Sequence, residues 1–469
     1  MIGGSNPPAP AIAAVSPASL TPSADRLVAV VLAAGLGTRM RSARPKHLHA
    51  ILGRRLVDWT VDAVRGAAVA RVVVVTSPEL RAELDETLED VEIAVQAKPR
   101  GTGDAVAAAR EALAGFDGDV LVVPGDSPLL TEAALRALAD AHARERPAAT
   151  VLAVETEREL PYGRIVRNET GGVSRIVEER DATPEERAIR ELNAGVYVFR
   201  AHDLWWALDR LEADNAQGEL YLTDTVAHLV GDGRPVGVVA SAGADAVQGV
   251  NTRVDLAHAA AVLRARIIER HMLAGVTVLD PATTWIEAGV EIEPDATVHP
   301  FTVLRGRTTV SANAEIGPHV VAHDAMIGRG ATVGPFCYLR PGTVLSEGAK
   351  AGAFVEVKNA TIGERAKVPH LSYIGDADIG EDSNIGAGAI TANYRAERYD
   401  EKQRTVIGRN VHTGSDNVFV PPVEIGDDAW IGAGSTITED VPPGALAIAR
   451  ARQINKEGYY RRGDRDDDD

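Results

Sequence analysis

The chain has 469 residues, and its 67 acidic and 49 basic side chains give a formal net charge of −18 at pH 7. Such a charge repels nucleic acid and anionic membranes, so neither is an expected partner. No apolar run approaches the roughly 18 residues that a membrane-spanning helix needs. One cysteine, Cys337, excludes an internal disulfide framework and favours a reducing, cytoplasmic location.

Both ends of the chain are expected to lie outside the folded domains. The first 25 residues contain five prolines and no lysine or arginine. This composition predicts a disordered leader over residues 1–26 rather than a signal peptide. Residues 456–469 end in an arginine and four aspartates and are predicted to form a polar tail.

Residues 27–253 alternate short apolar runs with helix-like segments. The apolar runs are 27–34, 71–77 and 120–130, and the helix-like segments are 56–67, 78–89 and 131–145. Strands buried on both faces and separated by helices predict a Rossmann-like α/β domain with a mostly parallel sheet. Ligands of such sheets bind at the carboxyl ends of the strands. Residues 254–274 contain apolar side chains at helical spacing and are predicted to form a linker helix.

The first apolar run ends in a glycine loop, Ala34-Gly35-Leu36-Gly37-Thr38-Arg39, and Pro45-Lys46 follows. Backbone amides of such a loop can approach a polyphosphate, and Arg39 and Lys46 add positive charge. The loop fits neither the Rossmann GxGxxG pattern nor the P-loop. It predicts that the chain handles a nucleoside triphosphate, and the alternative is an ordinary turn with two solvated cations.

Within the third apolar run, the sequence Pro124-Gly125-Asp126 ends the predicted buried strand with a carboxylate. A carboxylate at the end of a buried strand can hold a hard cation between phosphates. The alternative for Asp126 is a helix cap or turn residue. Asp126 falls at the same predicted sheet edge as the glycine loop, and the residues alone leave both interpretations open.

After about residue 275 the apolar period changes to six. The aliphatic and aromatic residues that recur at this spacing are Ile292, Val298, Leu304, Val310 and Ile316; Ile327, Val333, Leu339 and Leu345; and Phe419, Ile425, Ile431 and Ile437. An Ile-Gly or Val-Gly pair occurs ten times between residues 290 and 437. This pattern is typical of a parallel β-helix of hexapeptide repeats, predicted here over residues 275–455.

With both halves in view, the chain resembles the bacterial bifunctional N-acetylglucosamine-1-phosphate uridyltransferase and glucosamine-1-phosphate N-acetyltransferase family over residues 27 to about 460. The resemblance implies a left-handed β-helix, a cytoplasmic homotrimer and a requirement for Mg²⁺. It also implies a two-step route to UDP-N-acetylglucosamine, a precursor of peptidoglycan and other cell-envelope polymers, from glucosamine-1-phosphate, acetyl-coenzyme A and UTP.

In the first half, the resemblance assigns catalysis to Arg39 and Lys46 and a metal ion to Asp126 and Asn251. The positions that match UTP and UDP-sugar contacts are Ala34, Gly35, Lys46, Gln96, Gly101, Thr102, Gly163, Glu178, Asn193, Thr223 and Asn251. The implied reaction is attack of a sugar-1-phosphate oxygen on the α-phosphorus of UTP. Positioning and charge neutralisation then carry the catalysis.

In the second half, His370 matches the family's catalytic base, and histidine suits proton removal from an amine near neutral pH. The matching substrate contacts are Arg340, Lys358, Tyr373, Asn384, Asn393, Tyr394 and Lys402. The matching acetyl-coenzyme A contacts are Ala387, Ser415, Ala433 and Arg450. These positions fall on different faces of the prism, so the site is expected to be shared between subunits.

The segment from Asn393 to Thr405 departs from the family pattern, because it is three residues longer and lacks an Asp-Gly turn. We expect residues 395–404 to form a mobile lid. Whether Lys402 reaches the acetyltransferase site depends on how this lid folds. Histidines 299, 319, 323 and 412 are interpreted as structural. A zinc β-helix of the γ-carbonic anhydrase kind is the alternative for this half, and it would need three convergent histidines.

Two alternatives to the bifunctional enzyme remain at this stage. One is a monofunctional sugar-1-phosphate nucleotidyltransferase whose β-helix regulates or oligomerises, as in glucose-1-phosphate adenylyltransferases. The other is a scaffold protein that has lost catalysis. The first gives no reason for His370 and Asn384 to occur together, and the second gives none for retaining Lys46, Asp126 and Asn251.

Overall fold

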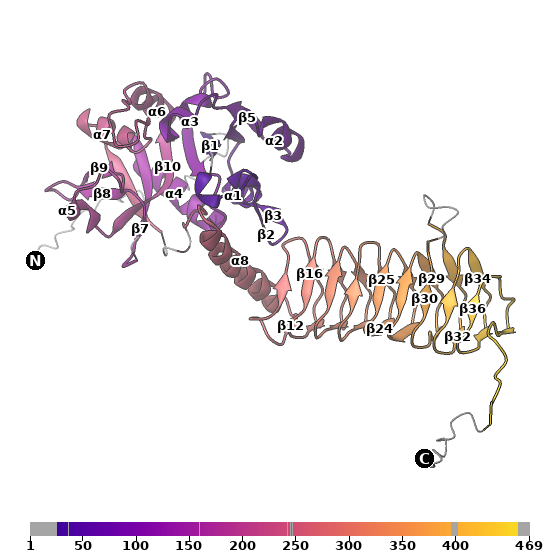
Figure 1. The fold of residues 1–469 in the computed structure, drawn as a ribbon. Helices are drawn as coiled ribbons and strands as arrows, with labels where there is room; N and C mark the ends of the chain where they lie inside the picture. The colour runs from indigo at the N-terminus through magenta and orange to yellow at the C-terminus, as the bar shows by residue number, and fades with distance from the viewer. Residues whose placement is uncertain are drawn as a thin grey trace, which may run out of the picture. The chain divides into compact units, whose positions relative to one another are not determined.

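The computed structural model describes residues 26–35, 37–158, 160–241, 243, 245, 247–394 and 402–457. Residues 1–25 of the predicted leader, most of the predicted lid and the last residues of the predicted tail lie outside these ranges. The chain divides into two compact units between Ala259 and Ala260, inside helix α8 (Arg253–Leu273) (Figure 1). In the described part of the chain, no helix has the length and apolar character needed to cross a membrane.

The first unit is built on a mixed sheet. Its main path runs β11 (Val236–Ala240), β7 (Ala149–Glu155), β10 (Glu191–Arg200), β6 (Asp119–Pro124), β1 (Leu27–Ala33), β4 (Arg71–Thr76) and β5 (Glu92–Val95). All neighbours on this path are parallel except β10, which is antiparallel to both β6 and β7. The mostly parallel sheet predicted from the sequence is confirmed, with this one strand reversed.

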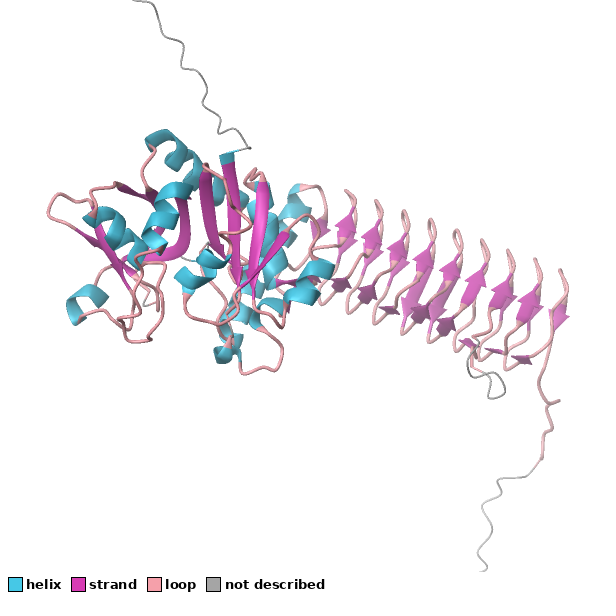
Figure 2. Ribbon diagram, turned by 90° about the horizontal axis from the view of Figure 1, so that it is seen from above, coloured by secondary structure: helices cyan, strands magenta, loops and turns pink. Residues whose placement is uncertain are grey.

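Short strands and helices complete this unit. The additional strands are β2 (Ala50–Ile51), β3 (Arg54–Arg55), β8 (Arg164–Arg167) and β9 (Val173–Val177). The helices are α1 (Leu56–Gly66), α2 (Arg81–Thr87), α3 (Thr102–Ala108), α4 (Glu132–Glu145), α5 (Pro184–Arg187), α6 (Ala201–Leu208) and α7 (Asp224–Gly231), with 3₁₀ turns η2 at Thr38–Met40 and η3 at Lys46–Leu48. Figure 2 shows helices on both sides of the sheet.

Alternation along β1 explains why this sheet has two cores. Val28 and Val30 belong to a cluster with side chains of α3, α6 and α7. Ala29 and Val31 belong to a second cluster, with side chains of α1, α2 and α4. Because successive residues of a strand point to opposite faces, an unbroken apolar run buries both faces at once.

The sheet places the two predicted nucleotide motifs side by side. Strand β1 pairs in parallel with β6, and Leu32 is the register partner of Pro124. The glycine loop therefore leaves the same sheet edge as the turn that carries Asp126. This edge is the carboxyl end of the parallel strands, where ligands of α/β sheets bind.

The second unit is a parallel β-helix of the left-handed hexapeptide type, with three faces. The first face holds β12 (Thr277–Val278), β15 (Thr297–Val298), β18 (Glu315–Ile316), β21 (Thr332–Val333), β24 (Lys350–Ala353) and β27 (Lys367–His370), and continues with β32 (His412–Thr413), β35 (Trp430–Ile431) and β37 (Leu446–Ala447). The second face holds β13 (Trp285–Ile286), β16 (Val303–Arg305), β19 (Val321–His323), β22 (Tyr338–Leu339), β25 (Glu356–Lys358), β28 (Tyr373–Gly375), β30 (Ile390–Thr391), β33 (Val418–Phe419) and β36 (Thr436–Ile437).

The third face holds β14 (Glu291–Ile292), β17 (Thr309–Val310), β20 (Met326–Ile327), β23 (Val344–Leu345), β26 (Thr361–Ile362), β29 (Ala377–Ile379), β31 (Thr405–Ile407) and β34 (Val423–Ile425). Register partners from coil to coil are the period-six residues, for example Val298 with Ile316 and Ile316 with Val333. All three are buried. The hexad prediction is confirmed, because each coil contributes one such residue per face to a continuous core.

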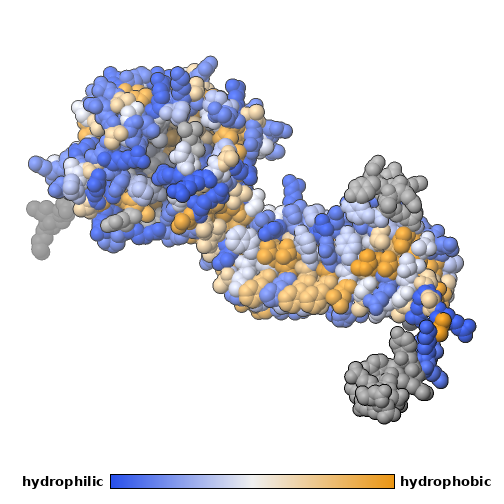
Figure 3. All heavy atoms as spheres, viewed as in Figure 1, coloured by the Kyte–Doolittle hydropathy of each residue, from blue (hydrophilic) through white to orange (hydrophobic). Residues whose placement is uncertain are grey.

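Aromatic rings line one edge of the β-helix, at the turn before the second face. Phe301, His319, Phe336 and Phe354 form a stack with centroid separations of 4.7, 4.8 and 5.1 Å and nearly parallel planes. The three phenylalanines are 49 to 57% exposed, although exposed rings of this size are unfavourable in water. Figure 3 shows that hydrophobic side chains gather on the visible face of the β-helix. We call the four stacked residues the aromatic edge.

Candidate active sites

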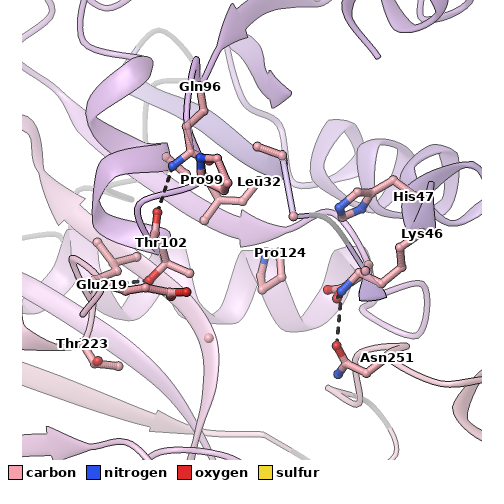
Figure 4. A pocket seen from close by; sticks show the side chains of 18 of the residues that line it. Leu32, Lys46, His47, Gln96, Pro99, Thr102, Pro124, Glu219, Thr223 and Asn251 are labelled. Carbon is pink, nitrogen blue, oxygen red and sulfur yellow. Dashed lines mark hydrogen bonds and ion pairs between the residues drawn. The ribbon is translucent and has the colours of Figure 1, made fainter. Parts of the chain in front are cut away.

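A cavity of about 530 Å³ lies at the carboxyl end of β1 and β6. It is lined by all but one of the residues expected to contact a nucleotide or a metal: Ala34, Gly35, Arg39, Lys46, Gln96, Gly101, Thr102, Asp126, Glu178, Asn193, Thr223 and Asn251. In Figure 4, Gln96 and Thr102 lie on one side of the cavity and Lys46 and Asn251 on the other, with Pro124 between them. Gly163 does not line the cavity; its carbonyl accepts the backbone N–H of Asn193 at 2.8 Å.

At one end of the cavity, two cationic side chains contact the side-chain oxygens of Asp126 and Asn251. The Lys46 ammonium forms an ion pair with Asp126 and donates to Asn251 Oδ1 at 3.2 Å. Arg39 donates to the same oxygen at 2.9 Å. Burial alone would raise the pKa of Asp126, but the adjacent Lys46 ammonium holds it below its ordinary value. Asp126 therefore stays charged at neutral pH.

The carboxylate and amide oxygens at this end are ligands of the kind that a hard divalent cation prefers. A carboxylate and an amide oxygen already converge on one ammonium, which marks a position where positive charge is stabilised. Among the described residues, no three His, Cys, Asp or Glu side chains are grouped closely enough to hold a metal by themselves. A divalent cation bound by Asp126 and Asn251 would therefore need further ligands from outside the protein.

His47 is a lining residue that the sequence analysis did not identify. It is 2% exposed, and neither ring nitrogen has a hydrogen-bond partner in the described part of the chain. Burial, with the neighbouring Lys46 ammonium, lowers the pKa of His47 to about 4. The one sequence signal for His47 is its position next to Lys46, because a single buried histidine produces no periodic pattern in the sequence.

The loop from Gln96 to Gly103 is fastened to the segment that precedes α7. Gly103 donates to the Leu220 carbonyl at 2.8 Å, and the Thr102 hydroxyl accepts the Leu222 N–H at 3.0 Å. Gly101 has a φ of 113°, and a Cβ there would lie 2.5 Å from the Leu220 carbonyl oxygen. Only glycine fits this position without moving the backbone.

Between these ends, polar side chains are already paired with one another. The Asn193 amide donates to the Tyr197 hydroxyl at 2.7 Å, and the Thr223 hydroxyl donates to Glu178 at 3.0 Å. Burial raises the pKa of Glu178. These groups present buried donors and acceptors to a polar ligand such as a sugar, and their mutual bonds hold them in place before it arrives.

The second candidate site follows the β-helix edge that carries the aromatic stack. At this edge Ala353 is the register partner of His370, and further along Gly388 donates to the Leu371 carbonyl. Asp416 and Gly434 donate in the same way to the carbonyls of the residues expected at a coenzyme, Ala387 and Ser415, at 2.7 and 2.8 Å. The residues assigned to this edge thus occupy successive coils: His370, Ala387, Ser415 and Ala433. Arg450 donates to the Ala433 carbonyl at 2.7 Å.

Small side chains distinguish this part of the edge from the aromatic part. Beyond Leu371, the positions that continue the aromatic edge are Gly388, Asp416 and Gly434, and His370 is exposed beside the change. An edge without large side chains leaves room for an extended ligand next to a histidine. An extended ligand bound along this edge would therefore have one end next to His370, the candidate general base.

A cationic cluster lies at the carboxyl end of strand β25, in the second face. Lys358 and Lys402 are close enough that the Lys402 ammonium lowers the pKa of Lys358. Lys402 also lies 5.9 Å from the centre of the Tyr394 ring. Lys402 therefore reaches the cluster despite the longer segment before it; residues 395–401 themselves are outside the described residues.

The remaining substrate positions divide between two faces. Asn393 is 5% exposed and donates to Asp376 and, at 3.4 Å, to the Tyr373 hydroxyl. Arg340 pairs with Glu356 at 2.8 Å on the same face. Asn384 instead bridges Lys367 and His412 on the first face. One chain thus brings together the cationic cluster, Tyr373 and Asn393, but leaves Asn384 on another side of the prism.

The histidines of the zinc alternative have different surroundings. His299 pairs with Glu315 at 2.8 Å, and His323 pairs with its neighbour Asp324. His319 lies within the aromatic edge, and His412 stacks on Trp430 at 4.7 Å. No three of them converge among the described residues, so this chain has no triad of the carbonic anhydrase kind there.

Comparison with protein-family models assigns each unit to a class. Residues 29–230 match the MobA-like NTP transferase domain, and residues 404–439 match the bacterial transferase hexapeptide model with its six repeats. Fold, cavity and matches together define an enzyme that joins a nucleotidyltransferase domain to a hexapeptide-repeat acyltransferase domain.

Whole-chain relatives narrow the assignment. A protein of Mycolicibacterium vanbaalenii is 50% identical over 457 residues, covering 92% of each chain. A Corynebacterium glutamicum protein is 46% identical over 92% of this chain and 93% of its own, and one from Streptomyces avermitilis is 47% identical over 92% and 94%. Each of them is named bifunctional protein GlmU. The chain belongs to the GlmU family.

Proposed function

We propose that this bifunctional enzyme makes UDP-N-acetylglucosamine in two steps. The β-helix unit acetylates glucosamine-1-phosphate from acetyl-coenzyme A, and the α/β unit transfers UMP from UTP to the resulting N-acetylglucosamine-1-phosphate. The observation that carries the proposal is that one chain holds the Lys46–Asp126–Asn251 group at the end of a nucleotide-sized cavity and an exposed His370 on an open β-helix edge. The product would supply peptidoglycan and so cell-wall growth and cell shape.

In the uridylyl step a phosphate oxygen of the sugar-1-phosphate attacks the α-phosphorus of UTP. The bond from that phosphorus to the bridging oxygen breaks, and pyrophosphate leaves with its electron pair. Asp126 and Asn251 would hold Mg²⁺, which supplies charge neutralisation for the phosphates. Lys46 and Arg39, whose cations now rest on those ligands, would turn to the phosphate oxygens when the nucleotide binds.

In the acetyl step the sugar amine attacks the thioester carbonyl carbon, forming the N–C bond. The C–S bond breaks, and coenzyme A leaves as a thiolate that takes up a proton. His370 would accept the proton that the nitrogen loses. Arg340, Lys358 and Lys402 would hold the sugar phosphate, since two adjacent ammonium groups repel until an anion lies between them.

The aromatic edge supports a homotrimer. Exposed stacked phenylalanines lose accessible apolar surface when a second copy covers them. A neighbouring copy could also bring residues of its first face, among them Asn384, next to the cationic cluster of the second face. Each acetyltransferase site would then contain residues from more than one chain, whereas the cavity at Lys46 belongs to a single chain.

One assay tests both activities. Purified enzyme receives glucosamine-1-phosphate, acetyl-coenzyme A and UTP with Mg²⁺, together and with each omitted, while free thiol and UDP-sugar are both measured. The proposal expects thiol release without UTP, and UDP-sugar only when all three are present or when N-acetylglucosamine-1-phosphate replaces the first two. UDP-sugar formation without any thiol release from glucosamine-1-phosphate would instead indicate a monofunctional nucleotidyltransferase with an oligomerising β-helix.

A further inference from the structure

The side-chain amide of Gln96 is held in one orientation inside the nucleotide cavity. Gln96 is 6% exposed, and its Nε2 donates to the Gly101 carbonyl at 3.1 Å and to Asp104 Oδ2 at 2.8 Å. A primary amide has two N–H donors and one carbonyl oxygen. Both donors are used, so the oxygen is the group that remains for a ligand.

The two neighbours of the amide make the reverse orientation unfavourable. A backbone carbonyl and an ionised carboxylate can only accept hydrogen bonds. Turning the amide over would place its oxygen against two other oxygens, leaving a buried polar group unsatisfied and repelled. Of the two partners, the carboxylate is the one that a side-chain substitution can change.

Asp104 itself is held by a cation on its far side. Arg100 donates to Oδ1 at 2.6 Å, while Oδ2 accepts from Gln96. The Asp104 side chain is 12% exposed and that of Arg100 is 67% exposed. Asp104 does not line the nucleotide cavity, whereas Gln96 does. Asp104 therefore acts on a ligand only through the amide that it orients.

Hydrogen-bond donors lie beside this acceptor. Gly101 and Thr102 line the same cavity, and their backbone N–H groups have no acceptor among the residues that the structure describes. An acceptor next to donors complements a ring N–H flanked by carbonyl oxygens, which is the imide edge of uracil. Cytosine has a ring nitrogen that accepts and an exocyclic amine that donates, so it reverses this pattern.

We propose that Asp104 is a positioning residue for base selection: by holding the Gln96 amide, it makes the cavity prefer a uracil nucleotide over a cytosine nucleotide. The inference rests on the proposed uridylyl transfer in this cavity. It concerns the choice between bases, and not the presence of activity. Loss of a fixed hydrogen-bond pattern reduces discrimination because a buried polar group then adapts to either base.

The decisive variant is Asp104→Asn. Arg100 can only donate, so it would turn the asparagine oxygen towards itself and leave the asparagine NH₂ facing Gln96. That NH₂ favours the opposite orientation of the Gln96 amide, whereas the unchanged Gly101 carbonyl still favours the original one. The amide would therefore no longer be fixed, and it could present either its oxygen or its N–H donors to the base. We expect the ratio of kcat/KM for UTP to kcat/KM for CTP, measured with N-acetylglucosamine-1-phosphate, to fall by about tenfold or more.

The matched control is Arg100→Ala, which removes the exposed partner but keeps the carboxylate that accepts from Gln96. Its UTP to CTP ratio should stay within about threefold of the wild-type ratio. A purely structural role for Asp104 would lower both kcat/KM values together and leave their ratio unchanged. Calorimetric binding of UDP and CDP gives the same comparison without turnover.

The outcomes separate the two proposals. Wild-type enzyme without UTP-dependent activity would overturn the proposed function. Wild-type enzyme that prefers UTP, together with an Asp104→Asn variant that keeps the full preference, would overturn the role of Asp104 alone. If thermal melting shows that Asp104→Asn does not fold, Asp104→Ala decides by the same ratio, because it also releases one amide hydrogen.

Discussion

The two candidate sites differ in how much of each one chain provides. Many side chains that line the nucleotide cavity are buried or half-buried and already paired with one another, such as Asn193 with Tyr197 and Thr223 with Glu178. The β-helix edge instead exposes His370, Ser415 and Ala433, which lie on three different coils. A globular α/β unit can enclose a ligand by itself, whereas a ligand on the outer edge of a β-helix is enclosed only when a neighbouring subunit covers it.

The largest expected effect tests whether the two sites are independent. Asp126→Ala removes the carboxylate proposed to hold Mg²⁺, and we expect pyrophosphate release to fall by on the order of a thousandfold. Thiol release from acetyl-coenzyme A should stay within about twofold, because the two units have separate cores. Uridylyl transfer at the wild-type rate would remove Asp126 from the metal site.

The converse substitution is His370→Ala. Loss of a positioned general base should lower acetyl transfer by about a hundredfold to ten-thousandfold while uridylyl transfer is unchanged. Rates of thiol release across pH 6 to 9, a range that brackets the ordinary histidine pKa of about 6.5, give the measurement. Normal acetylation throughout that range would make the monofunctional nucleotidyltransferase the better account.

Breaking the aromatic edge should affect only the site that depends on a second copy. Phe336→Asp places a charge in the middle of the stack, so we expect smaller assemblies in light scattering and acetyl transfer lowered by about tenfold or more. Uridylyl transfer per chain should not change. Glu315→Asp, on the neighbouring face, serves as the control, and an unchanged assembly of Phe336→Asp would show that the aromatic edge is not the interface.

The smallest expected effect concerns Lys402. Lys402→Ala removes one of two adjacent ammonium groups, so the KM for glucosamine-1-phosphate should rise by roughly threefold to tenfold, with little change in kcat. Lys358→Ala provides the comparison, since both ammonium groups belong to the same cluster. A variant of Lys402 with unaltered kinetics would mean that the longer segment carries this lysine away from the substrate.

Regular patterns in the sequence were sufficient for the architecture. The apolar run that became β1 predicted burial on both faces, and the period-six residues became the register partners of the β-helix. The antiparallel direction of β10 could not be predicted, because an apolar pattern is the same in either direction along a strand. The linker helix was predicted at 254–274 and spans Arg253–Leu273.

Motifs predicted which residues surround the cavity, but not how they are paired. Lys46, Asp126 and Asn251 come from three separate segments, and their convergence follows from the register of β1 with β6 and the return of the chain before α8. The orientation of Gln96 depends on a contact with Asp104 that no motif records. The isolation of His47 is likewise a property of packing. Gly163 matched a contact position, yet it supports Asn193 from outside the cavity.

Because the acetyltransferase residues lie on stacked coils, the coils also determine the order in which these residues would be released on local unfolding. Each coil packs only on its neighbours, so a solenoid opens most easily from its end, here beyond β37. Opening there would release Arg450 and Ala433 first and His370 last. The coenzyme contacts would then be lost at an earlier stage of unfolding than the position of His370. Bound coenzyme should therefore slow hydrogen exchange more strongly in the terminal coils than in the coil of His370.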